Sequence, residues 1–235
     1  AGGVSLGDLD QDGLLDVVLT AGARASKIFR QVSPWKFEEV SWDPKLSELW
    51  SSGAAILDID NDGDLDIYLC NSDTATSLYI NVTKPGGPIQ FEERAKEWGL
   101  DIADASLNPS FADYDGDGDL DFVIMDFTGV PPFGLPSQRI AWARNDGGSD
   151  WTVLPISGSE EGLESFEVAD MDGDGDLDVI TGAYGRRTSF NPFGFDIGTG
   201  AYLRVYTNNG QGSFTQNTIL DSNDAKYIEE VTVAD

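Results

Sequence analysis

The sequence has no histidine, a single cysteine, and only 14 lysines and arginines against 42 acidic residues. The lack of histidine excludes Ser-His-Asp and Cys-His catalysis, and it excludes metal sites built on histidine ligands. Cys70 has no partner for an internal disulfide, and we interpret it as a small buried hydrophobic residue rather than a nucleophile. The net charge of −28 argues against nucleic acid and anionic membrane surfaces as partners. No apolar run is long enough to predict insertion into a membrane.

The acidic residues are concentrated in a nine-residue pattern that occurs four times, at residues 8–16, 58–66, 113–121 and 170–178. Each copy has Asp at positions 1, 3, 5 and 9, Gly at position 6 and Leu at position 8. Alternate residues of a tightly curled loop can direct oxygen ligands at one hard cation, and a glycine permits the sharp turn. The sequence therefore predicts four calcium loops.

We expect each loop to bind one Ca²⁺ through positions 1, 3, 5, 7 and 9, with position 7 contributing its backbone carbonyl. The expected ligands in the first two loops are Asp8, Asp10, Asp12, Leu14, Asp16, Asp58, Asp60, Asp62, Asp64 and Asp66. Those in the last two loops are Asp113, Asp115, Asp117, Asp119, Asp121, Asp170, Asp172, Asp174, Asp176 and Asp178. The first loop should bind most weakly, because Leu14 stands where the other loops have Asp.

Two alternatives for these loops are disfavoured. An EF-hand needs Glu at position 12 and flanking helices, whereas position 12 here is Leu19, Leu69, Ile124 or Thr181 and the flanks are strand-like. Mg²⁺ in place of Ca²⁺ is disfavoured because Mg²⁺ demands octahedral geometry and retains its waters. Paired carboxylates acting as the acid and base of a glycosidase are a third possibility. A catalytic pair does not normally repeat four times, so we expect no enzyme within these residues.

The loops begin at residues 8, 58, 113 and 170, so the repeat is 50 to 57 residues long. Each repeat contains four short apolar segments separated by turn residues, and this pattern is typical of a propeller blade. We expect strands at residues 4–7, 15–20, 26–31, 36–41, 52–57, 65–70, 77–81, 89–94, 109–112, 121–126, 139–144, 151–156, 164–169, 178–182, 201–208 and 213–220.

The predicted fold is thus all-β: a β-propeller of four-stranded blades, with an Asp-rich calcium loop between the first two strands of each blade. Residues 1–235 form a single propeller region with repeats at about 1–50, 51–105, 106–160 and 161–228. Residues 229–235 look like the start of a further repeat, and the chain begins without Met. We therefore expect a processed or partial chain from a larger propeller.

The sequence of a small or apolar strand, Asp-x-Asp-x-Asp-Gly-x-Leu-Asp and an apolar strand resembles the FG-GAP or VCBS repeats of the integrin α-chain propeller. Residues 77–81 and 91–100 are similar to "Leu-Tyr-x-Asn … Phe-x-x-x-Ala-x-x-x-Gly-Leu", a pattern of the ASPIC/UnbV group to which cartilage acidic protein belongs. The resemblance implies a propeller, often seven-bladed, with Ca²⁺ in its loops. It also implies a secreted or cell-surface adhesion or scaffold module rather than an enzyme.

Calcium modules outside cells bind Ca²⁺ with a Kd of about 10⁻⁴–10⁻³ M, which suits an extracellular location. Asn81-Val82-Thr83 is a candidate glycosylation sequon. Residues 128–136 and 184–200 are insertions with exposed aromatic or Arg residues, and we expect them either to contact a protein or glycan partner or to pack on a neighbouring blade. The alternative functions are a lectin-like propeller attached to an enzyme, and a structural subunit of a surface assembly or filament.

Overall fold

The computed structural model describes residues 2–21, 25–42, 50–72, 74–84, 87–102, 109–128, 137–158, 163–184, 190–191, 194–195, 201–222 and 232. Strands are the only regular secondary structure in these residues, so nothing there forms a helix that could cross a membrane. The predicted all-β class is confirmed.

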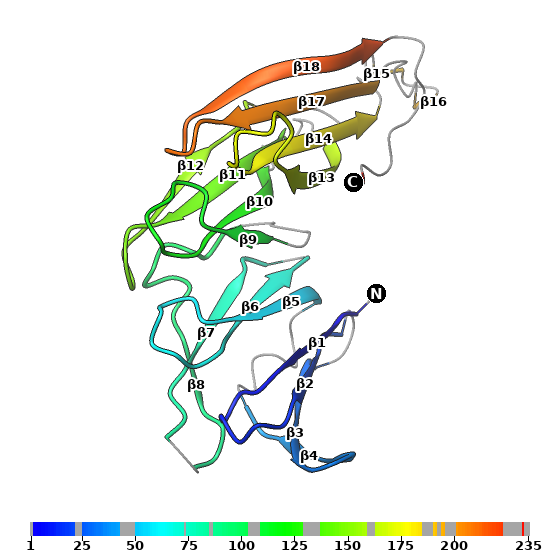
Figure 1. The fold of residues 1–235 in the computed structure, drawn as a ribbon. Coiled ribbons are helices and arrows are strands. Elements are labelled where there is room, and N and C mark those ends of the chain that lie inside the picture. The colour runs from blue at the N-terminus through cyan, green and yellow to red at the C-terminus, as the bar shows by residue number, and fades with distance from the viewer. Residues whose placement is uncertain are drawn as a thin grey trace. The chain divides into compact units, whose positions relative to one another are not determined.

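Sixteen of the strands form four separate four-stranded sheets (Figure 1). The first sheet contains β1 (Val4–Gly7), β2 (Asp16–Leu19), β3 (Lys27–Ser33) and β4 (Lys36–Val40). The second contains β5 (Ser51–Leu57), β6 (Asp66–Asn71), β7 (Ser77–Asn81) and β8 (Phe91–Glu93). The third contains β9 (Ser110–Ala112), β10 (Asp121–Thr128), β11 (Ser137–Asn145) and β12 (Trp151–Pro155). The fourth contains β13 (Leu163–Ala169), β14 (Asp178–Tyr184), β17 (Ala201–Asn208) and β18 (Phe214–Ser222).

Every sheet is an antiparallel meander in which strands adjacent in the sequence are also adjacent in the sheet, apart from the β15–β16 hairpin inserted in the fourth. This order is the one expected of propeller blades. In each sheet the Asp-rich loop joins the first strand to the second, and position 9 begins the second strand. The register repeats as well: Gly7 pairs with Asp16, and Leu57 pairs with Asp66. The number of blades and the closure of a ring stay predictions.

The strands on both sides of the first insertion and the strand before the second are longer than predicted. β10 continues to Thr128, which pairs with Ser137 at the start of β11. Residues 129–136 lie outside the described part of the chain. Within the second insertion, β15 (Phe190–Asn191) pairs with β16 (Gly194–Phe195). The rest of 185–200 and nearly all of 223–235 are likewise outside the described residues, so a partner surface in the insertions and a further repeat stay predictions.

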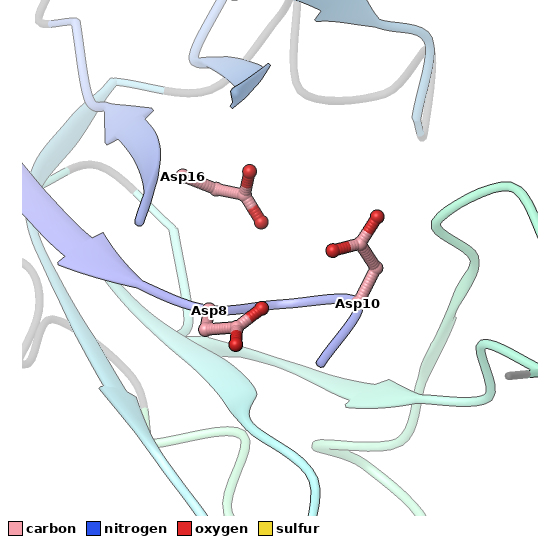
Figure 2. Close-up of side chains that lie close together, drawn as sticks. All are labelled: Asp8, Asp10 and Asp16. Carbon is pink, nitrogen blue, oxygen red and sulfur yellow. The ribbon is translucent and has the colours of Figure 1, made fainter. Parts of the chain in front are cut away.

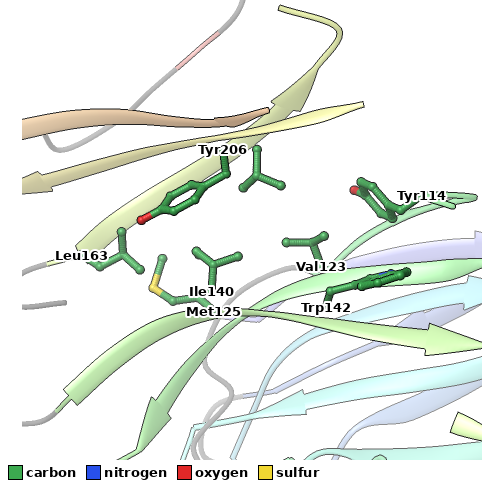
Figure 3. Packing of buried hydrophobic residues seen from close by; sticks show 8 residues of the cluster. Tyr114, Val123, Met125, Ile140, Trp142, Leu163 and Tyr206 are labelled. Atoms are coloured by element: carbon green, nitrogen blue, oxygen red, sulfur yellow. The ribbon is translucent and has the colours of Figure 1, made fainter. Parts of the chain in front are cut away.

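By its contacts the chain divides into two compact units, Ala1–Pro109 with Asn145–Val153, and Ser110–Arg144 with Leu154–Asp235. The core of the first unit lies between the first two sheets and includes Leu9, Val18 and Ile28 facing Ile67, Leu69 and Tyr79. The core of the second unit contains Tyr114, Val123, Met125, Ile140, Trp142, Leu163, Val179 and Tyr206 (Figure 3). Each core is therefore built by one sheet packing on the next, which is how propeller blades bury their faces.

The first strands of the first, second and fourth sheets carry an apolar pair at the same register. Ala54 and Ile56 in the second sheet pack on the first sheet, and Phe166 and Val168 in the fourth pack on the third. Val4 and Leu6 hold these positions in the first sheet, yet they are 67% and 58% exposed. The apolar pair in the first strand therefore reflects a requirement for packing against another sheet, rather than a requirement for folding of the sheet itself.

Candidate metal centres

The four Asp-rich loops share one internal hydrogen-bond scheme. The position-1 carboxylate accepts from the backbone N–H of the glycine at position 6: Gly13 to Asp8 (2.8 Å), Gly63 to Asp58, Gly118 to Asp113 and Gly175 to Asp170 (3.0 Å each). The position-5 carboxylate accepts from the N–H of position 7: Leu14 to Asp12, Asp64 to Asp62, Asp119 to Asp117 and Asp176 to Asp174. Two of the predicted ligands in each loop thus also hold the loop in its curl.

The position-9 aspartates Asp16, Asp66, Asp121 and Asp178 are fully buried. In every loop the Oδ2 atom of this residue accepts from the N–H of position 2, at 2.8–3.1 Å. In three sheets its Oδ1 atom is shown to accept from the N–H of a residue in the third strand: Gln31, Asn81 or Asn208. Position 9 therefore connects the loop to the sheet.

Two residues in each loop adopt the left-handed backbone conformation. Position 6 is glycine throughout, as predicted, and Gly63 and Gly118 have φ of 93° and 99°. Position 4 is left-handed as well, with φ of 58–81°. Its occupants are Gln11, Asn61, Gly116 and Gly173. Glycine and asparagine enter this region most readily, so Gln11 is the unfavourable member of the set.

The loops bring carboxylate oxygens within 4.8 Å of one another in four groups. Positions 1, 3 and 9 meet in the first loop, where Figure 2 shows Asp8, Asp10 and Asp16 directed toward a common centre. The same positions meet in the third and fourth loops, whereas positions 1, 3 and 5 meet in the second. The remaining predicted ligands belong to these loops but not to the groups: positions 5 and 7 in the first, third and fourth loops, and positions 7 and 9 in the second.

Burial and crowding raise the pKa of several of these carboxyl groups. Burial is the main cause for Asp66, whose pKa rises to about 7, and for Asp64, whose pKa rises to about 6 with further contributions from Asp62, Asp60 and Asp58. The pKa of Asp16 is raised as well, also mainly by burial. A carboxylate with a raised pKa lacks compensating positive charge, and a bound cation would supply that charge.

The second and third loops each contain a carboxylate oxygen that is buried and has no hydrogen-bond partner in the described structure, Asp64 Oδ1 and Asp115 Oδ1. A buried polar atom left without a partner costs roughly 1–3 kcal/mol, and more when it is charged. A cation among these oxygens would remove that cost. The donor set of closely spaced carboxylates in a curled loop suits a hard cation, so all four groups could hold a metal ion.

In the second, third and fourth sheets, an asparagine at the end of the third strand connects the sheet to the loop of the preceding repeat. Asn81 Nδ2 donates to the backbone carbonyl of Leu9, at position 2 of the first loop. Asn145 Nδ2 donates in the same way to Ile59 in the second loop, and Asn208 Nδ2 donates to Tyr114 in the third. These residues are 0–4% exposed. The side-chain amide thus joins one repeat to the metal loop of the repeat before it.

This geometry argues against the glycosylation candidate. Asn81 is 2% exposed, and its Nδ2 atom, to which a glycan would be attached, donates to both Leu9 O and Leu65 O. Its Oδ1 atom accepts from the N–H of Thr83, so both polar atoms of the Asn81 amide are already engaged in hydrogen bonds. The sequence pattern Leu-Tyr-Ile-Asn81 therefore marks a buried structural contact.

Cys70 is 1% exposed, and its burial raises the pKa of the thiol to about 12. The thiol therefore remains protonated at neutral pH, whereas a nucleophile would need the thiolate. The interpretation of Cys70 as a buried hydrophobic residue is confirmed.

The repeated geometry has a counterpart among known protein families. A family model described as an FG-GAP-like repeat matches residues 8–69, 58–124 and 133–181, which together exceed half of the sequence. The chain belongs to the FG-GAP-like repeat family. FG-GAP-like repeats suggest a propeller-type protein-interaction module, and the four sheets are consistent with its blades. A comparison with curated proteins found no match. The ASPIC/UnbV subgroup stays a prediction.

Two features of the site were missed by sequence reasoning. The bridging asparagines follow position 9 by 15, 24 and 30 residues, at 81, 145 and 208, because insertions of different length intervene. The irregular spacing obscures the recurrence, although each of them ends a strand that contains several apolar or aromatic residues. The second missed feature is the left-handed backbone conformation at position 4. The sequence has Gln, Asn, Gly and Gly at this position in the four loops, and such a set of residues indicates a left-handed turn.

Proposed function

We propose that this FG-GAP-like chain is a calcium-binding module that acts in extracellular adhesion or scaffolding through contacts with proteins or glycans. The observation that carries the proposal is the fourfold recurrence of converging carboxylates in loops that join the first two strands of successive sheets. Each ion would neutralise crowded negative charge at the point where a hairpin turns. The module would therefore depend on the ion for rigidity.

The charge of the chain supports Ca²⁺ as the ion. Nineteen of the 42 acidic residues lie at odd positions of the four loops, with four in the first loop and five in each of the others. Two such charges about 4 Å apart repel by roughly 4 kcal/mol at a surface-like effective dielectric constant. Ca²⁺ accepts six to eight oxygen ligands in flexible geometry, whereas Mg²⁺ requires a regular octahedron. A nine-residue loop with alternate Asp residues offers the flexible arrangement.

An extracellular location follows from the expected affinity. Extracellular calcium modules bind with a Kd of about 10⁻⁴–10⁻³ M. Such loops would be filled outside cells and largely empty in the cytosol, where this crowding of carboxylates would oppose folding. We propose a binding rather than a catalytic role, because the sequence has no histidine and Cys70 is buried with a raised pKa.

The test is thermal unfolding of the chain in excess chelator, in millimolar Ca²⁺ and in millimolar Mg²⁺. A ligand present at about 100 times its Kd stabilises the folded state by roughly 2.7 kcal/mol per site. Several filled loops should therefore raise the midpoint by many degrees in Ca²⁺ and much less in Mg²⁺. Equal midpoints in chelator and Ca²⁺ would refute the calcium proposal. Replacing Asp60 and Asp172 at position 3 of two loops by Asn should reduce the shift.

A groove in the first unit favours glycan binding as a second candidate function. It has a volume of about 490 Å³ and is lined by Trp42, Tyr79 and Phe91 together with acidic residues that include Glu93. Aromatic rings beside carboxylates can stack on a sugar and accept hydrogen bonds from its hydroxyl groups, and the volume lies within the range of ligand sites. A glycan array probed with the calcium-loaded chain and with Trp42→Ala tests this function. Binding that is lost in the variant supports it, and an array without signal refutes it.

A further inference from the structure

The first metal loop differs from the second and fourth because an arginine side chain contacts its carboxylates. Arg30, in the middle of β3, places Nε 2.5 Å from Asp10 Oδ2 and one terminal nitrogen 3.4 Å from Asp12 Oδ2. Asp10 and Asp12 are positions 3 and 5 of the first loop. The side chain of Asp10 is only 2% exposed, so this ion pair is formed largely away from solvent. A cation of the protein itself therefore already neutralises this loop in part.

The residue at the equivalent place is uncharged beside the second and fourth loops. Gln31, Asn81 and Asn208 all donate their backbone N–H to a position-9 carboxylate, so the residues that precede them correspond. They are Arg30, Ile80 and Thr207. The first loop also has Leu14 at position 7, where the second and fourth loops have Asp. Compared with the second and fourth loops, the first loop therefore has one carboxylate fewer and one additional positive charge beside it.

We propose that Arg30 is an internal counter-ion that weakens metal binding by the first loop, so that this loop fills and empties at higher Ca²⁺ concentration than the second and fourth. The inference rests on the proposed function, since it requires the loops to bind Ca²⁺. A guanidinium group on two of the expected ligands repels a divalent ion at the same carboxylates. Even with water-like screening, a unit charge within about 5 Å of such an ion should weaken binding about tenfold.

Arg30 could instead orient Asp10 for metal binding, as outer-sphere partners often do. The two roles predict opposite signs. If Arg30 orients its partner, its removal weakens binding to the first loop. If it acts as a counter-ion, its removal strengthens binding. The sign of the change in affinity therefore decides between them.

The glycine at position 6 gives each loop its own spectroscopic reporter. The N–H groups of Gly13 and Gly63 donate to the position-1 carboxylate of the first and second loops. Their backbone resonances in ¹H–¹⁵N spectra should shift as each loop binds its ion. A Ca²⁺ titration of the full chain followed at these two resonances then yields a separate midpoint for each loop.

The experiment compares the wild-type chain with Arg30→Gln, Arg30→Lys and a matched control, Lys27→Met. Lys27 is also on β3 and pairs with Glu39, but it lies opposite Leu19, at the end of β2 away from the loop. We expect the wild-type midpoint of Gly13 to lie about tenfold above that of Gly63. Arg30→Gln should lower the Gly13 midpoint about tenfold and leave Gly63 unchanged. Arg30→Lys and Lys27→Met should each change the Gly13 midpoint by less than about threefold.

Three results would overturn the inference in different ways. Equal midpoints for Gly13 and Gly63 in the wild-type chain would show that the first loop is not weakened. A higher Gly13 midpoint in Arg30→Gln would assign an orienting role to Arg30. Both of these results leave the calcium proposal intact. If neither glycine shifts in the wild-type chain, the loops do not bind Ca²⁺ and the proposed function fails together with the inference.

Discussion

Replacing Asn81 by Ala should strongly destabilise the junction between the first two sheets. The Nδ2 atom of Asn81 donates to Leu9 O at 2.8 Å and to Leu65 O at 3.0 Å, at a site that is 2% exposed. Truncation leaves the buried carbonyl of Leu9 and the partly buried carbonyl of Leu65 without this donor, and each loss costs roughly 1–3 kcal/mol. We therefore expect a total loss of about 2–5 kcal/mol. Asn81→Asp keeps the shape but turns an acceptor toward both carbonyls, so it should cost at least as much.

The measurement is urea unfolding in saturating Ca²⁺, followed by tryptophan fluorescence, because Trp42 stacks against Tyr79 at this junction. Asn217→Ala is the matched control, since its Nδ2 atom also donates to two acceptors, Thr207 Oγ1 and Thr215 O, but at an exposed site and at 3.4 Å. The control should change the free energy of unfolding by less than about 0.5 kcal/mol. If Asn81→Ala proved as mild as the control, the assignment of Asn81 as a structural bridge would be wrong.

Three further predictions concern the loops and the core. The ion-free chain should become more stable as pH falls from 8 to 5. The pKa values of Asp64 (about 6) and Asp66 (about 7) are raised in the folded state, so the folded state takes up protons at higher pH than the unfolded state. Urea midpoints in chelator should rise as pH falls over this range, and midpoints that fall would contradict the assignment. Gly63→Ala should cost about 1–2 kcal/mol in the same assay, since φ is 93° and an added Cβ meets nothing within 4 Å, so only the backbone is strained. Cys70 should react with iodoacetamide far more slowly in the folded chain than in urea, and equal rates would contradict its burial.

Much of the fold could be predicted from the sequence because the repeat is short and each loop contains characteristic Asp and Gly residues. The position-6 glycines and the alternating Asp residues fix where each hairpin turns, and the strands on both sides follow from their apolar residues. The ends of the strands were less predictable. β10 and β14 run past the predicted ends at 126 and 182, because hairpin pairing continues into insertions whose composition is not typical of strands.

The side-chain contacts between repeats could not be read from the sequence. Asn81 fits a glycosylation sequon, and only the packing of two sheets shows that its amide is buried. Arg30 is one basic residue on a strand, and its contact with Asp10 is visible only in the folded structure. The sequence around Val4 and Leu6 is that of an ordinary strand, and it does not show that this pair is exposed whereas the matching pairs in the second and fourth sheets are packed. Such contacts depend on three-dimensional register rather than on local pattern.

The central claim is that each of the four loops binds a calcium ion, and a crystal structure grown in millimolar Ca²⁺ with anomalous data tests it most directly. We predict an anomalous peak in every loop, coordinated by carboxylates at positions 1 and 3 together with further oxygen ligands at 2.3–2.6 Å. Peaks in only the second to fourth loops would be consistent with weak binding by the first. Loops that contain only water, or that bind Mg²⁺ in preference to Ca²⁺, would contradict the claim.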